Sequence, residues 1–391
     1  LWYIGDEISH KPDQEYPFPA GYKYDYCNPD VLLNRLSVKD GLVVTPEGLS
    51  YKFIWIPENK RMLPETLEKL HALLEQGATV VANAPQRICT LAGGDETQAR
   101  FDKNVEAIWG KAADGSITTI GKGRLLAGVT IEKAIELLDL KQDVQGDVRW
   151  LHRHVKGADW YFITPEKQQA FKGKVSFRAQ GAAELWDPIT GEITPLNVER
   201  QGEYASIELD MPKAGSCFVV FNHNKKQEKV EKVELANTQS IDNKWTVQFP
   251  EGWGAPAELE IETLAPWCEL PMSKEGQAFS GSATYTTTFN WSNESKEVVL
   301  DLGKVSMIAE VFVNDQKVRT LWCTPYAADI TSYLKQGENK LQVKVTSTWF
   351  NRLAFDASLP EADRKTWTIS GPEAGSPLKE YGLLGPVTLK Y

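Results

Sequence analysis

The stretch from Val311 to Leu334 reads VFVNDQKVRTLWCTPYAADITSYL, and its first half alternates apolar and polar residues as a half-buried β-strand does. Asn314 and Asp315 interrupt this alternation, and residues of these types favour a tight turn between two strands. Beyond this stretch, residues 233–391 contain about eight short alternating segments that are separated by turn residues. This spacing predicts that 233–391 forms a β jelly roll.

Residues 1–143 carry a different pattern, in which apolar runs of strand length alternate with helical periodicity. The segment from Tyr51 to Pro57 is a continuous apolar run, as expected for a parallel strand that is covered on both faces. A helical pattern follows, with Pro64 near its start and Gly77 where a C-terminal cap belongs, and then a second apolar run, ATVVAN. Strand, helix and strand in this order are typical of a right-handed crossover. We predict a doubly wound α/β domain over 1–143, of the flavodoxin-like or glutamine-amidotransferase-like kind.

Two segments join these regions. Residues 144–223 alternate with a period of two from Val148 onward and contain frequent turn residues, which predicts a small antiparallel β-sandwich. Residues 224–232 are polar and charged without apolar periodicity, and we interpret them as a linker. A chain of 391 residues is also too long for one ordinary core. The predicted protein is therefore multidomain, with an α/β domain, a β-sandwich and a jelly roll in that order.

The composition limits the partners of the chain. Its formal net charge is −10, which repels the phosphate backbone of nucleic acids and anionic lipid surfaces. The sequence contains no run of about 18 apolar residues, the length that a membrane-spanning helix needs. The five cysteines lie far apart and form no CxxC pair, so they indicate neither a zinc site nor a disulfide framework. We therefore expect no nucleic acid partner and no membrane partner.

The first two domains contain no motif that nominates a catalytic or metal site. After the strand that ends at Ile56 the sequence reads PENKRMLPE rather than GxGxxG, which argues against a dinucleotide site. Cys89 lacks the glycine-flanked elbow of a catalytic nucleophile, so a scaffold role is favoured. His152 and His154 lie two apart on a predicted strand, and their rings point to one face. Because no third ligand is visible nearby, a structural role is favoured for the pair and no metal site is predicted.

The loops of the predicted jelly roll supply the strongest candidates for a carbohydrate site. The candidates are Trp322, Pro325, Tyr326, Trp349, Asn351 and Arg352. An aromatic ring can cover the apolar face of a sugar, while an amide and a guanidinium can bind its hydroxyl groups. In the alternative interpretation both tryptophans cap the core of the jelly roll, and Arg352 pairs with a nearby acid such as Asp356. The sequence leaves both interpretations open.

Several segments resemble known families. The sugar-binding jelly-roll domain of family 2 glycoside hydrolases, a galactose-binding-like fold, is similar to FSGSATYTTTF (279–289), VVLDLGKVSMIAEVFVNDQKV (298–318) and LLGPVTL (383–389). The C-terminal portion of the large bacterial α-L-rhamnosidases of glycoside hydrolase family 106 is similar to PAGYKYDYCNPDVLLNR (19–35), VRWLHRHVKGADWYFIT (148–164) and AAELWDPITGEITPL (182–196). The second resemblance extends over essentially the whole chain in the same order.

The rhamnosidase resemblance implies where catalysis takes place. In that family the catalytic glutamates and their calcium ion lie in a (β/α)8 barrel that precedes these domains, so we expect the catalytic acids outside this chain. The resemblance implies a position at the rim of the barrel's pocket for Tyr24, Asp25, Asn28 and His152. The only cofactor that it allows here is a structural calcium ion. Thr320 stands where family members often have glycine, which would limit the approach of a ligand.

These observations lead to one main hypothesis and two alternatives. We expect the chain to be the accessory C-terminal part of an extracellular or periplasmic glycoside hydrolase that acts on rhamnose-containing plant polysaccharide. Its domains would brace the catalytic barrel and bind carbohydrate. One alternative is a free-standing carbohydrate-binding protein that uses the loops around Trp322 and Trp349. The other is a complete glycosidase, although no motif nominates a catalytic pair among the 53 acidic residues. Whether the chain is itself an enzyme is left open.

Overall fold

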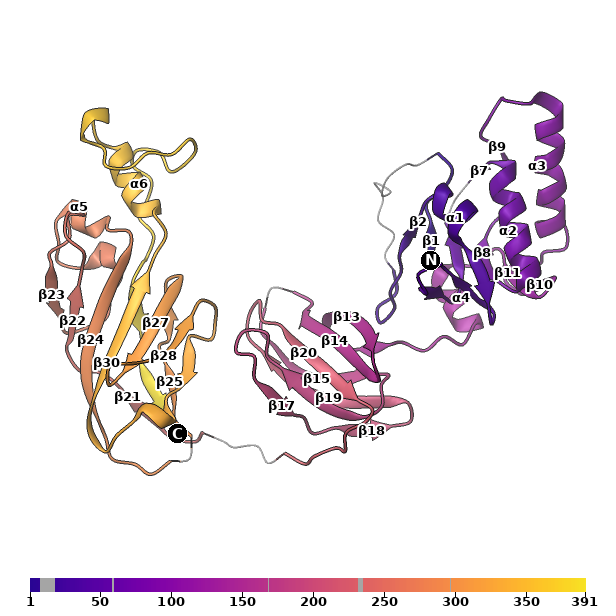
Figure 1. Cartoon of the computed structure of the whole chain (residues 1–391). Coiled ribbons are helices and arrows are strands. Elements are labelled where there is room, and N and C mark those ends of the chain that lie inside the picture. Colours follow the sequence, from indigo (N-terminus) through magenta and orange to yellow (C-terminus); the bar gives the residue numbers. More distant parts are fainter. Residues whose placement is uncertain (8–17, 58–59, 168, 231–234, 296) are drawn as a thin grey trace.

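The computed structural model describes residues 1–7, 18–57, 60–167, 169–230, 235–295 and 297–391. In Figure 1 they form three bodies that follow one another along the chain. We name them the N-terminal module (1–140), the middle module (144–223) and the C-terminal module (238–391), in each case for the described residues. The domain boundaries given above stay predictions. Within the described ranges, no helix is both long and apolar enough to cross a membrane.

The N-terminal module is built on a six-stranded sheet. Its strands are, in spatial order, β2 (Tyr26–Cys27), β1 (Trp2–Tyr3), β6 (Ile54–Ile56), β8 (Thr79–Ala82), β11 (Gly123–Leu126) and β10 (Ile117–Ile120). Neighbouring strands run parallel, except that β10 runs antiparallel to β11. Smaller sheets contain β3 (Ser37–Lys39), β4 (Leu42–Val44) and β5 (Ser50–Tyr51), and the pair β7 (Arg61–Met62) and β9 (Arg87–Ile88).

Helices pack on both faces of this six-stranded sheet. They are α1 (Pro29–Arg35), α2 (Pro64–Gln76), α3 (Gly94–Trp109) and α4 (Ile131–Leu137). Ile54 and Ile56 pack into one core with residues of α1, α2 and α3, whereas Trp55 between them packs with residues of α4. This division arises because successive residues of a strand point to opposite faces. The predicted strand, helix and strand are β6, α2 and β8, and Gly77 caps α2 with a φ of 120°. The doubly wound classification stays a prediction.

The middle module consists of two antiparallel sheets that share one hydrophobic core. The first sheet contains β12 (Val144–Gln145), β15 (Phe171–Phe177), β19 (Tyr204–Met211) and β18 (Glu199–Gln201). The second contains β13 (Val148–Val155), β14 (Ala158–Pro165), β20 (Cys217–Asn222), β16 (Ala182–Trp186) and β17 (Ile193–Pro195). The rings of Tyr161, Phe177 and Phe221 meet between the sheets, with centroids 4.9–5.9 Å apart.

The predicted linker 224–232 is described up to residue 230 and contains neither helix nor strand over 224–230. Gln227 donates from Nε2 to the backbone carbonyl of Leu196 at 2.7 Å. The side chain of Asn197 exchanges two hydrogen bonds with the backbone of Val230, at 2.7 and 3.0 Å. The described part of this segment is therefore attached to the middle module.

The C-terminal module contains two larger antiparallel sheets around one core. The six-stranded sheet contains β23 (Glu258–Ile261), β22 (Trp245–Gln248), β24 (Ser282–Trp291), β30 (Gly337–Thr346), β27 (Ile308–Val313) and β28 (Gln316–Leu321). The remaining strands are β21 (Thr238–Ser240), β32 (Thr388–Lys390), β25 (Val299–Asp301) and β29 (Ala327–Asp329), and the pair β26 (Lys304–Val305) and β31 (Leu383–Gly385). The helical elements are α5 (Lys274–Gln277), α6 (Phe350–Ala357), η1 (Trp267–Glu269), η2 (Thr331–Tyr333) and η3 (Glu361–Asp363).

The turn expected at Asn314 and Asp315 joins β27 to β28. Both residues lie in the left-handed region, with φ values of 51° and 65°, as the two central residues of a type I′ hairpin turn require. The side-chain amide of Asn314 also donates from Nδ2 to the backbone carbonyl of Tyr333 at 2.9 Å. The prediction of two strands and a tight turn in this stretch is therefore confirmed.

Candidate functional site

Trp322 and Tyr326 lie in the loop between β28 and β29, but they differ in exposure. Trp322 is 57% exposed. Tyr326 is buried, and its hydroxyl donates to the backbone carbonyl of Met307 at 2.7 Å. Burial raises the pKa of Tyr326. Of these two aromatic residues, Trp322 is thus the one that offers a ring to a ligand, while Tyr326 and the intervening Pro325 shape the loop.

Trp349 and Asn351 lie at the start of α6. Trp349 is 44% exposed, and its ring packs edge-on against Trp253 with centroids 5.0 Å apart. Asn351 is fully buried, and its amide group exchanges two hydrogen bonds of 2.8 Å with the backbone of Lys379. The indole of Trp349 is accessible to a ligand, whereas the amide of Asn351 holds the chain near Lys379. A role of either residue in carbohydrate binding stays a prediction.

Arg352 and its two carboxylate partners, Glu275 and Asp356, form a group that we call the arginine cluster. Arg352 and Asp356 are each 1% exposed. The Arg352 guanidinium donates to Asp356 Oδ1 at 2.6 Å and to Glu275 Oε1 at 2.7 Å. Asp356 Oδ2 accepts from the backbone N–H and the hydroxyl of Thr366, both at 2.7 Å. The pairing of Arg352 with Asp356, expected in the alternative interpretation, is thus present.

The arginine cluster influences the ionisation of its acids. Burial by itself would raise the pKa of Asp356, but the hydrogen bonds from Arg352 and Thr366 outweigh it and lower the pKa. Hydrogen bonds from Arg352 and Lys365 likewise lower the pKa of Glu275. The two terminal nitrogens of Arg352 donate to carboxylates within the protein, whereas its buried Nε has no hydrogen-bond partner among the described residues. Because Asp356 also accepts from Thr366, the cluster ties α6 to the segment that follows it. A carbohydrate-binding role of Arg352 stays a prediction.

The proposed rim residues of the N-terminal module have structural partners. Tyr24 packs against Phe18 and Trp2, with ring centroids 4.5 and 5.4 Å apart. Asp25 is exposed, and its Oδ2 accepts from the Tyr51 hydroxyl at 2.9 Å. Asn28 caps α1, because its Oδ1 accepts from the backbone N–H at the third residue after it, at 2.9 Å. Asp25 and Asn28 still present polar atoms at the surface, and their position at a pocket rim stays a prediction.

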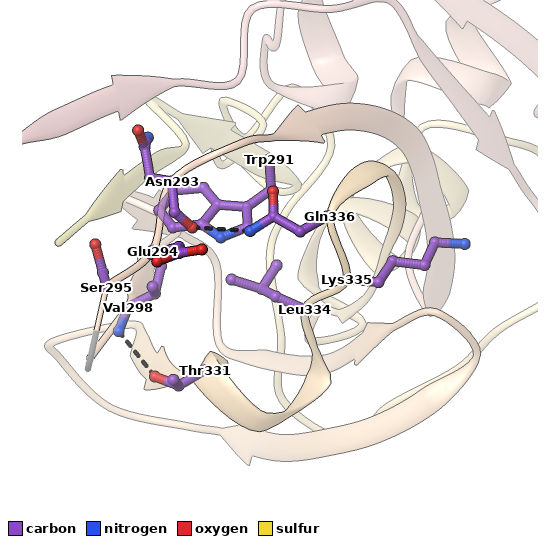
Figure 2. Close-up of a pocket in the computed structure, with 9 residues that line it drawn as sticks. All are labelled: Trp291, Asn293, Glu294, Ser295, Val298, Thr331, Leu334, Lys335 and Gln336. Carbon is purple, nitrogen blue, oxygen red and sulfur yellow. Dashed lines mark hydrogen bonds between the residues drawn. The ribbon is translucent and has the colours of Figure 1, made fainter.

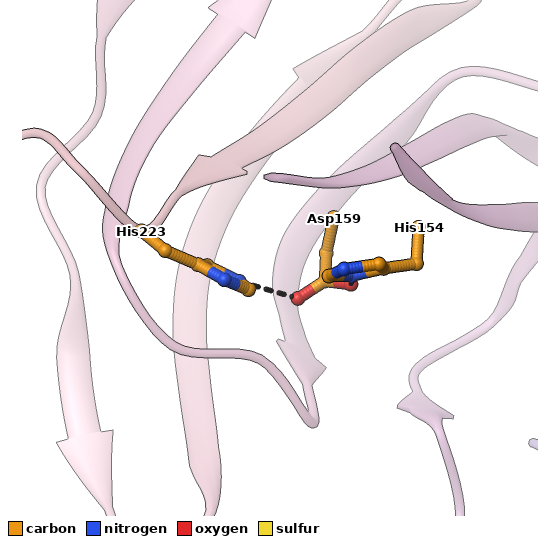
Figure 3. A group of neighbouring side chains, drawn as sticks. All are labelled: His154, Asp159 and His223. Carbon is orange, nitrogen blue, oxygen red and sulfur yellow. Dashed lines mark hydrogen bonds and ion pairs between the residues drawn. The ribbon is translucent and has the colours of Figure 1, made fainter. Parts of the chain in front are cut away.

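His152 belongs to a group in the middle module that we call the histidine cluster, namely His152, His154, Asp159 and His223. Asp159 Oδ1 lies 3.1 Å from His152 Nε2 and 2.9 Å from His154 Nδ1, and Oδ2 lies 2.8 Å from His223 Nε2. The other ring nitrogen of His152 lies 2.8 Å from Asp143 Oδ2. Figure 3 shows the rings of His154 and His223 on either side of the Asp159 carboxylate. Three imidazoles thus converge on one acid.

Contacts within the histidine cluster change the ionisation of its members. Burial by itself would lower the pKa of His152, but hydrogen bonds to Asp143 and Asp159 outweigh it and raise the pKa. Burial by itself would raise the pKa of Asp159, but the hydrogen bonds from the histidines outweigh it and lower the pKa. The first shift favours a protonated imidazole at His152, and the second favours a charged carboxylate at Asp159.

Sequence reasoning missed Asp159 and His223 as neighbours of the histidine pair. Asp159 lies directly opposite His154 in the hairpin of β13 and β14, so its position follows from the turn at 156–157. His223 is 64 residues from Asp159 along the chain, and the pairing of β14 with β20 brings it there. The alternating pattern and the turn at 156–157 could have predicted that Asp159 lies beside His154. The local sequence contains no feature that predicts the position of His223.

The C-terminal module also contains a cavity of about 510 Å³. Its lining residues are Trp291, Asn293, Glu294, Ser295, Val298, Thr331, Leu334, Lys335 and Gln336. Figure 2 shows the polar side chains of Asn293, Glu294 and Gln336 around the Trp291 indole, and Gln336 Nε2 donates to the Asn293 carbonyl at 3.2 Å. This volume lies within the range of about 300–1,000 Å³ that is usual for small-molecule pockets. The sequence did not nominate this cavity, because its residues come from two separate loops.

Comparison with known proteins identifies the family. Residues 2–200 match glycoside hydrolase family 106, which is described as alpha-L-rhamnosidase. This chain belongs to the α-L-rhamnosidase family. Residues 273–376 match the galactose-binding domain-like family of glycosyl hydrolase 2. Both resemblances noted in the sequence are confirmed, and with them a multidomain, strand-rich architecture with a galactose-binding-like domain.

Two relatives of this rhamnosidase family member are much longer than it. The rhamnosidase from Novosphingobium sp. PP1Y is 29% identical with a TM-score of 0.88, and the similarity covers 99% of this chain and 38% of that chain. A protein from Formosa agariphila, named "Putative beta-glucuronidase", is 41% identical over 121 residues, which is 30% of this chain and 10% of that protein. The chain therefore spans well under half the length of either relative.

Proposed function

We propose that this chain is the accessory C-terminal part of an α-L-rhamnosidase-like glycoside hydrolase, whose catalytic acids belong to a domain that the chain does not contain. The observation that carries the proposal is the extent of the similarity to the Novosphingobium rhamnosidase. That similarity takes up 99% of this chain but 38% of that enzyme. The larger part of a related glycosidase therefore has no counterpart here.

The chemistry of the described acids also supports the proposal that the catalytic acids lie outside this chain. Cleavage of a glycosidic bond usually needs two carboxyl groups, about 5–5.5 Å apart for retention or about 6.5–9.5 Å apart for inversion. The cavity beside Trp291 has one carboxylate among its lining residues, Glu294. Asp159 and Asp356 have lowered pKa values, whereas the general acid of a glycosidase needs a raised pKa. These acids are suited to hold cations rather than to protonate a leaving group.

The C-terminal module supplies the carbohydrate contact in this proposal. The exposed ring of Trp322 offers a flat apolar surface for a sugar. The cavity beside Trp291 is a separate surface, because Trp291 pairs with Gly337 at one end of β30, whereas β28 leads to Trp322 at the other end. A single platform such as the Trp322 ring buries few ligand atoms, so we expect dissociation constants on the order of micromolar to millimolar. The ligand is a rhamnose-containing plant oligosaccharide, and the parent enzyme acts in the extracellular or periplasmic space.

The N-terminal module acts as a scaffold in this proposal. We assign it to the doubly wound α/β class, since its five parallel strands carry α1, α2 and α3 on one face and α4 on the other. The exposed groups of Asp25 and Asn28 then lie near the rim of the pocket of the preceding barrel. Catalysis by this module alone is not part of the proposal.

An activity assay tests the accessory role. The chain is incubated with an aryl α-L-rhamnoside, next to the longer rhamnosidase from Novosphingobium sp. PP1Y. We expect turnover by that longer protein and none by the chain alone. Turnover by the chain alone that is lost in Glu294→Gln, or in another acid variant, would overturn the proposal in favour of a complete glycosidase.

Calorimetric titration with rhamnose-containing plant oligosaccharides tests the carbohydrate contact separately. We expect weak, saturable heat with the wild-type chain and its loss in Trp322→Ala. Trp367→Ala is a matched control, because Trp367 is 80% exposed but lies outside the loop of Trp322. Absence of heat with the wild type would remove the carbohydrate-binding part and leave the bracing role. Equal losses in both variants would point to non-specific aromatic contacts.

A further inference from the structure

The histidine cluster contains a set of ligand atoms that the carbohydrate proposal does not use. One ring nitrogen of His154, one ring nitrogen of His223 and a carboxylate oxygen of Asp159 all lie within 4.8 Å of one another. The imidazole rings of His154 and His223 have centroids 5.6 Å apart and are tilted by 39°, with the carboxylate between them. Two imidazole nitrogens and one carboxylate oxygen are a ligand set typical of zinc and related divalent transition metals.

The distances in the cluster are close to those of an occupied site. The two histidine nitrogens lie 2.9 and 2.8 Å from the oxygens of Asp159. Zinc binds such atoms at about 2.0–2.2 Å, so the ligand atoms of a tetrahedral site lie about 3.3 Å apart. Small rotations of exposed side chains are enough to open this space, because the His154 side chain is 61% exposed and that of His223 is 34% exposed.

A second layer of contacts holds the carboxylate in place. His152 Nε2 lies 3.1 Å from Asp159 Oδ1, while its Nδ1 lies 2.8 Å from Asp143. The His152 ring stacks on Tyr161 with centroids 4.1 Å apart and an interplanar angle of 16°. Metal sites in proteins commonly orient a ligating group through such outer hydrogen bonds. The chain therefore pre-orients the acid of this site before an ion arrives.

We propose that His154, Asp159 and His223 bind one divalent transition metal ion, with zinc as the natural candidate and solvent at the remaining position. This site replaces the purely structural interpretation of the histidine pair. It is independent of the carbohydrate function.

The position of the ligands gives the ion a mechanical role. His154 and Asp159 flank the turn between β13 and β14, whereas His223 directly follows β20 and immediately precedes the segment 224–230. The backbone N–H of His223 already donates to the carbonyl of Gly157 in that turn, at 3.0 Å. A bound ion therefore fastens the start of the segment that leads to the C-terminal module onto the hairpin.

Zinc titration of the chelator-treated chain tests the site with two variants that keep the hydrogen bonds. In His154→Asn the amide nitrogen takes the place of Nδ1, and in His223→Gln it takes the place of Nε2. Each variant can donate to Asp159 but has no imidazole lone pair for a metal. We expect one zinc ion per wild-type chain and an affinity at least about tenfold lower in either variant.

His71→Gln is the matched control, since His71 is a partly exposed histidine of α2 outside the cluster, with its side chain 32% exposed. We expect it to bind zinc as the wild type does. The proposal is overturned if saturation of the wild type needs zinc above about 1 mM. Unchanged affinity in both His154→Asn and His223→Gln, or an equal loss in His71→Gln, would overturn it as well.

Cobalt(II) replaces zinc in a second measurement that excludes the cysteines. Nitrogen and oxygen ligands give a cobalt spectrum without the charge-transfer band that a thiolate produces. We expect no such band in the wild type. A strong thiolate band would show that the ion binds at one of the five cysteines, and would overturn the assignment.

Limited trypsin digestion tests the mechanical role. Lys225, Lys226 and Lys229 lie just after His223 and are exposed to the protease. We expect zinc to slow cleavage in this segment for the wild type but not for His223→Gln. Zinc binding with an unchanged cleavage rate would retain the site and overturn its role in fastening the segment.

Discussion

The arginine cluster and the histidine cluster are built from similar charged groups but differ in their access to solvent. Arg352 and Asp356 are each 1% exposed, and Asp356 has further donors from the segment after α6. The side chain of His154 is 61% exposed and shares the Asp159 carboxylate with two other histidines. A buried ion pair such as Arg352 with Asp356 stabilises the fold and is not accessible to a ligand. The partly exposed histidine cluster leaves ring nitrogens accessible to a ligand. Burial, more than residue type, separates the two roles.

Removing one partner of the arginine cluster should have the largest effect on stability. Arg352→Ala leaves Asp356 buried without its cation, and we expect a loss of about 3–5 kcal/mol in the free energy of unfolding. Urea denaturation followed by tryptophan fluorescence measures this loss. Arg319→Ala is the control, because its pair with Glu192 at 3.1 Å is solvent-accessible and should cost less than about 1 kcal/mol. Similar losses in the two variants would contradict the comparison.

The pH dependence of stability gives a second test of the arginine cluster. The pKa of Asp356 is lowered in the folded protein, so its contribution is present above the ordinary aspartate pKa of about 3.9 and is lost as the pH falls through the folded value. We therefore expect the free energy of unfolding of the wild type to decrease below about pH 4. Urea titrations of Asp356→Asn at the same pH values should give a lower but flatter profile. Parallel profiles for the two proteins would show that Asp356 does not titrate as described.

Truncation of a histidine in the histidine cluster should lower the free energy of unfolding only slightly. We expect His154→Ala to lower the free energy of unfolding by less than about 1 kcal/mol in metal-free buffer, because exposed ion pairs contribute little. Urea denaturation in the presence of a chelator measures this effect. A loss as large as that of Arg352→Ala would mean that the histidine cluster is a closed structural network rather than an open site.

Truncation of the exposed aromatic ring should have the smallest effect on folding. Trp322 is 57% exposed, so we expect Trp322→Ala to change the free energy of unfolding by no more than about 0.5 kcal/mol. The control is Trp267→Ala, which removes a fully buried ring and should cost about 3–5 kcal/mol. Thermal and urea unfolding of both variants measure the difference. A large loss for Trp322→Ala would identify a capping role in the core, as the alternative interpretation of the sequence suggests.

Local features of the chain predicted much of the fold. The continuous apolar run before Pro57 and the glycine at position 77 were sufficient to predict β6, α2 and its cap. The alternation around Asn314 and Asp315 was sufficient to predict β27, β28 and their turn. These features depend on residues close together in sequence, where side-chain periodicity and backbone conformational preferences act directly.

The candidate site was less predictable, because similar residue types have different neighbours. Arg352 and Trp322 both belong to the predicted carbohydrate set, yet one is buried against Asp356 and the other faces solvent. The sequence contained both possibilities for Arg352 and could not rank them. Which side chain remains exposed depends on how loops that are far apart in sequence pack together.

The sequence alone determined that the chain has an α/β part and two β-rich parts, and that it resembles the α-L-rhamnosidase family. The tertiary structure alone decided that His223 meets Asp159 and that the loops of Trp291 and Gln336 line a common open cavity. The reason is physical: periodicity and turn chemistry act over a few residues, whereas strand pairing such as that of β14 with β20 sets contacts over more than 60 residues.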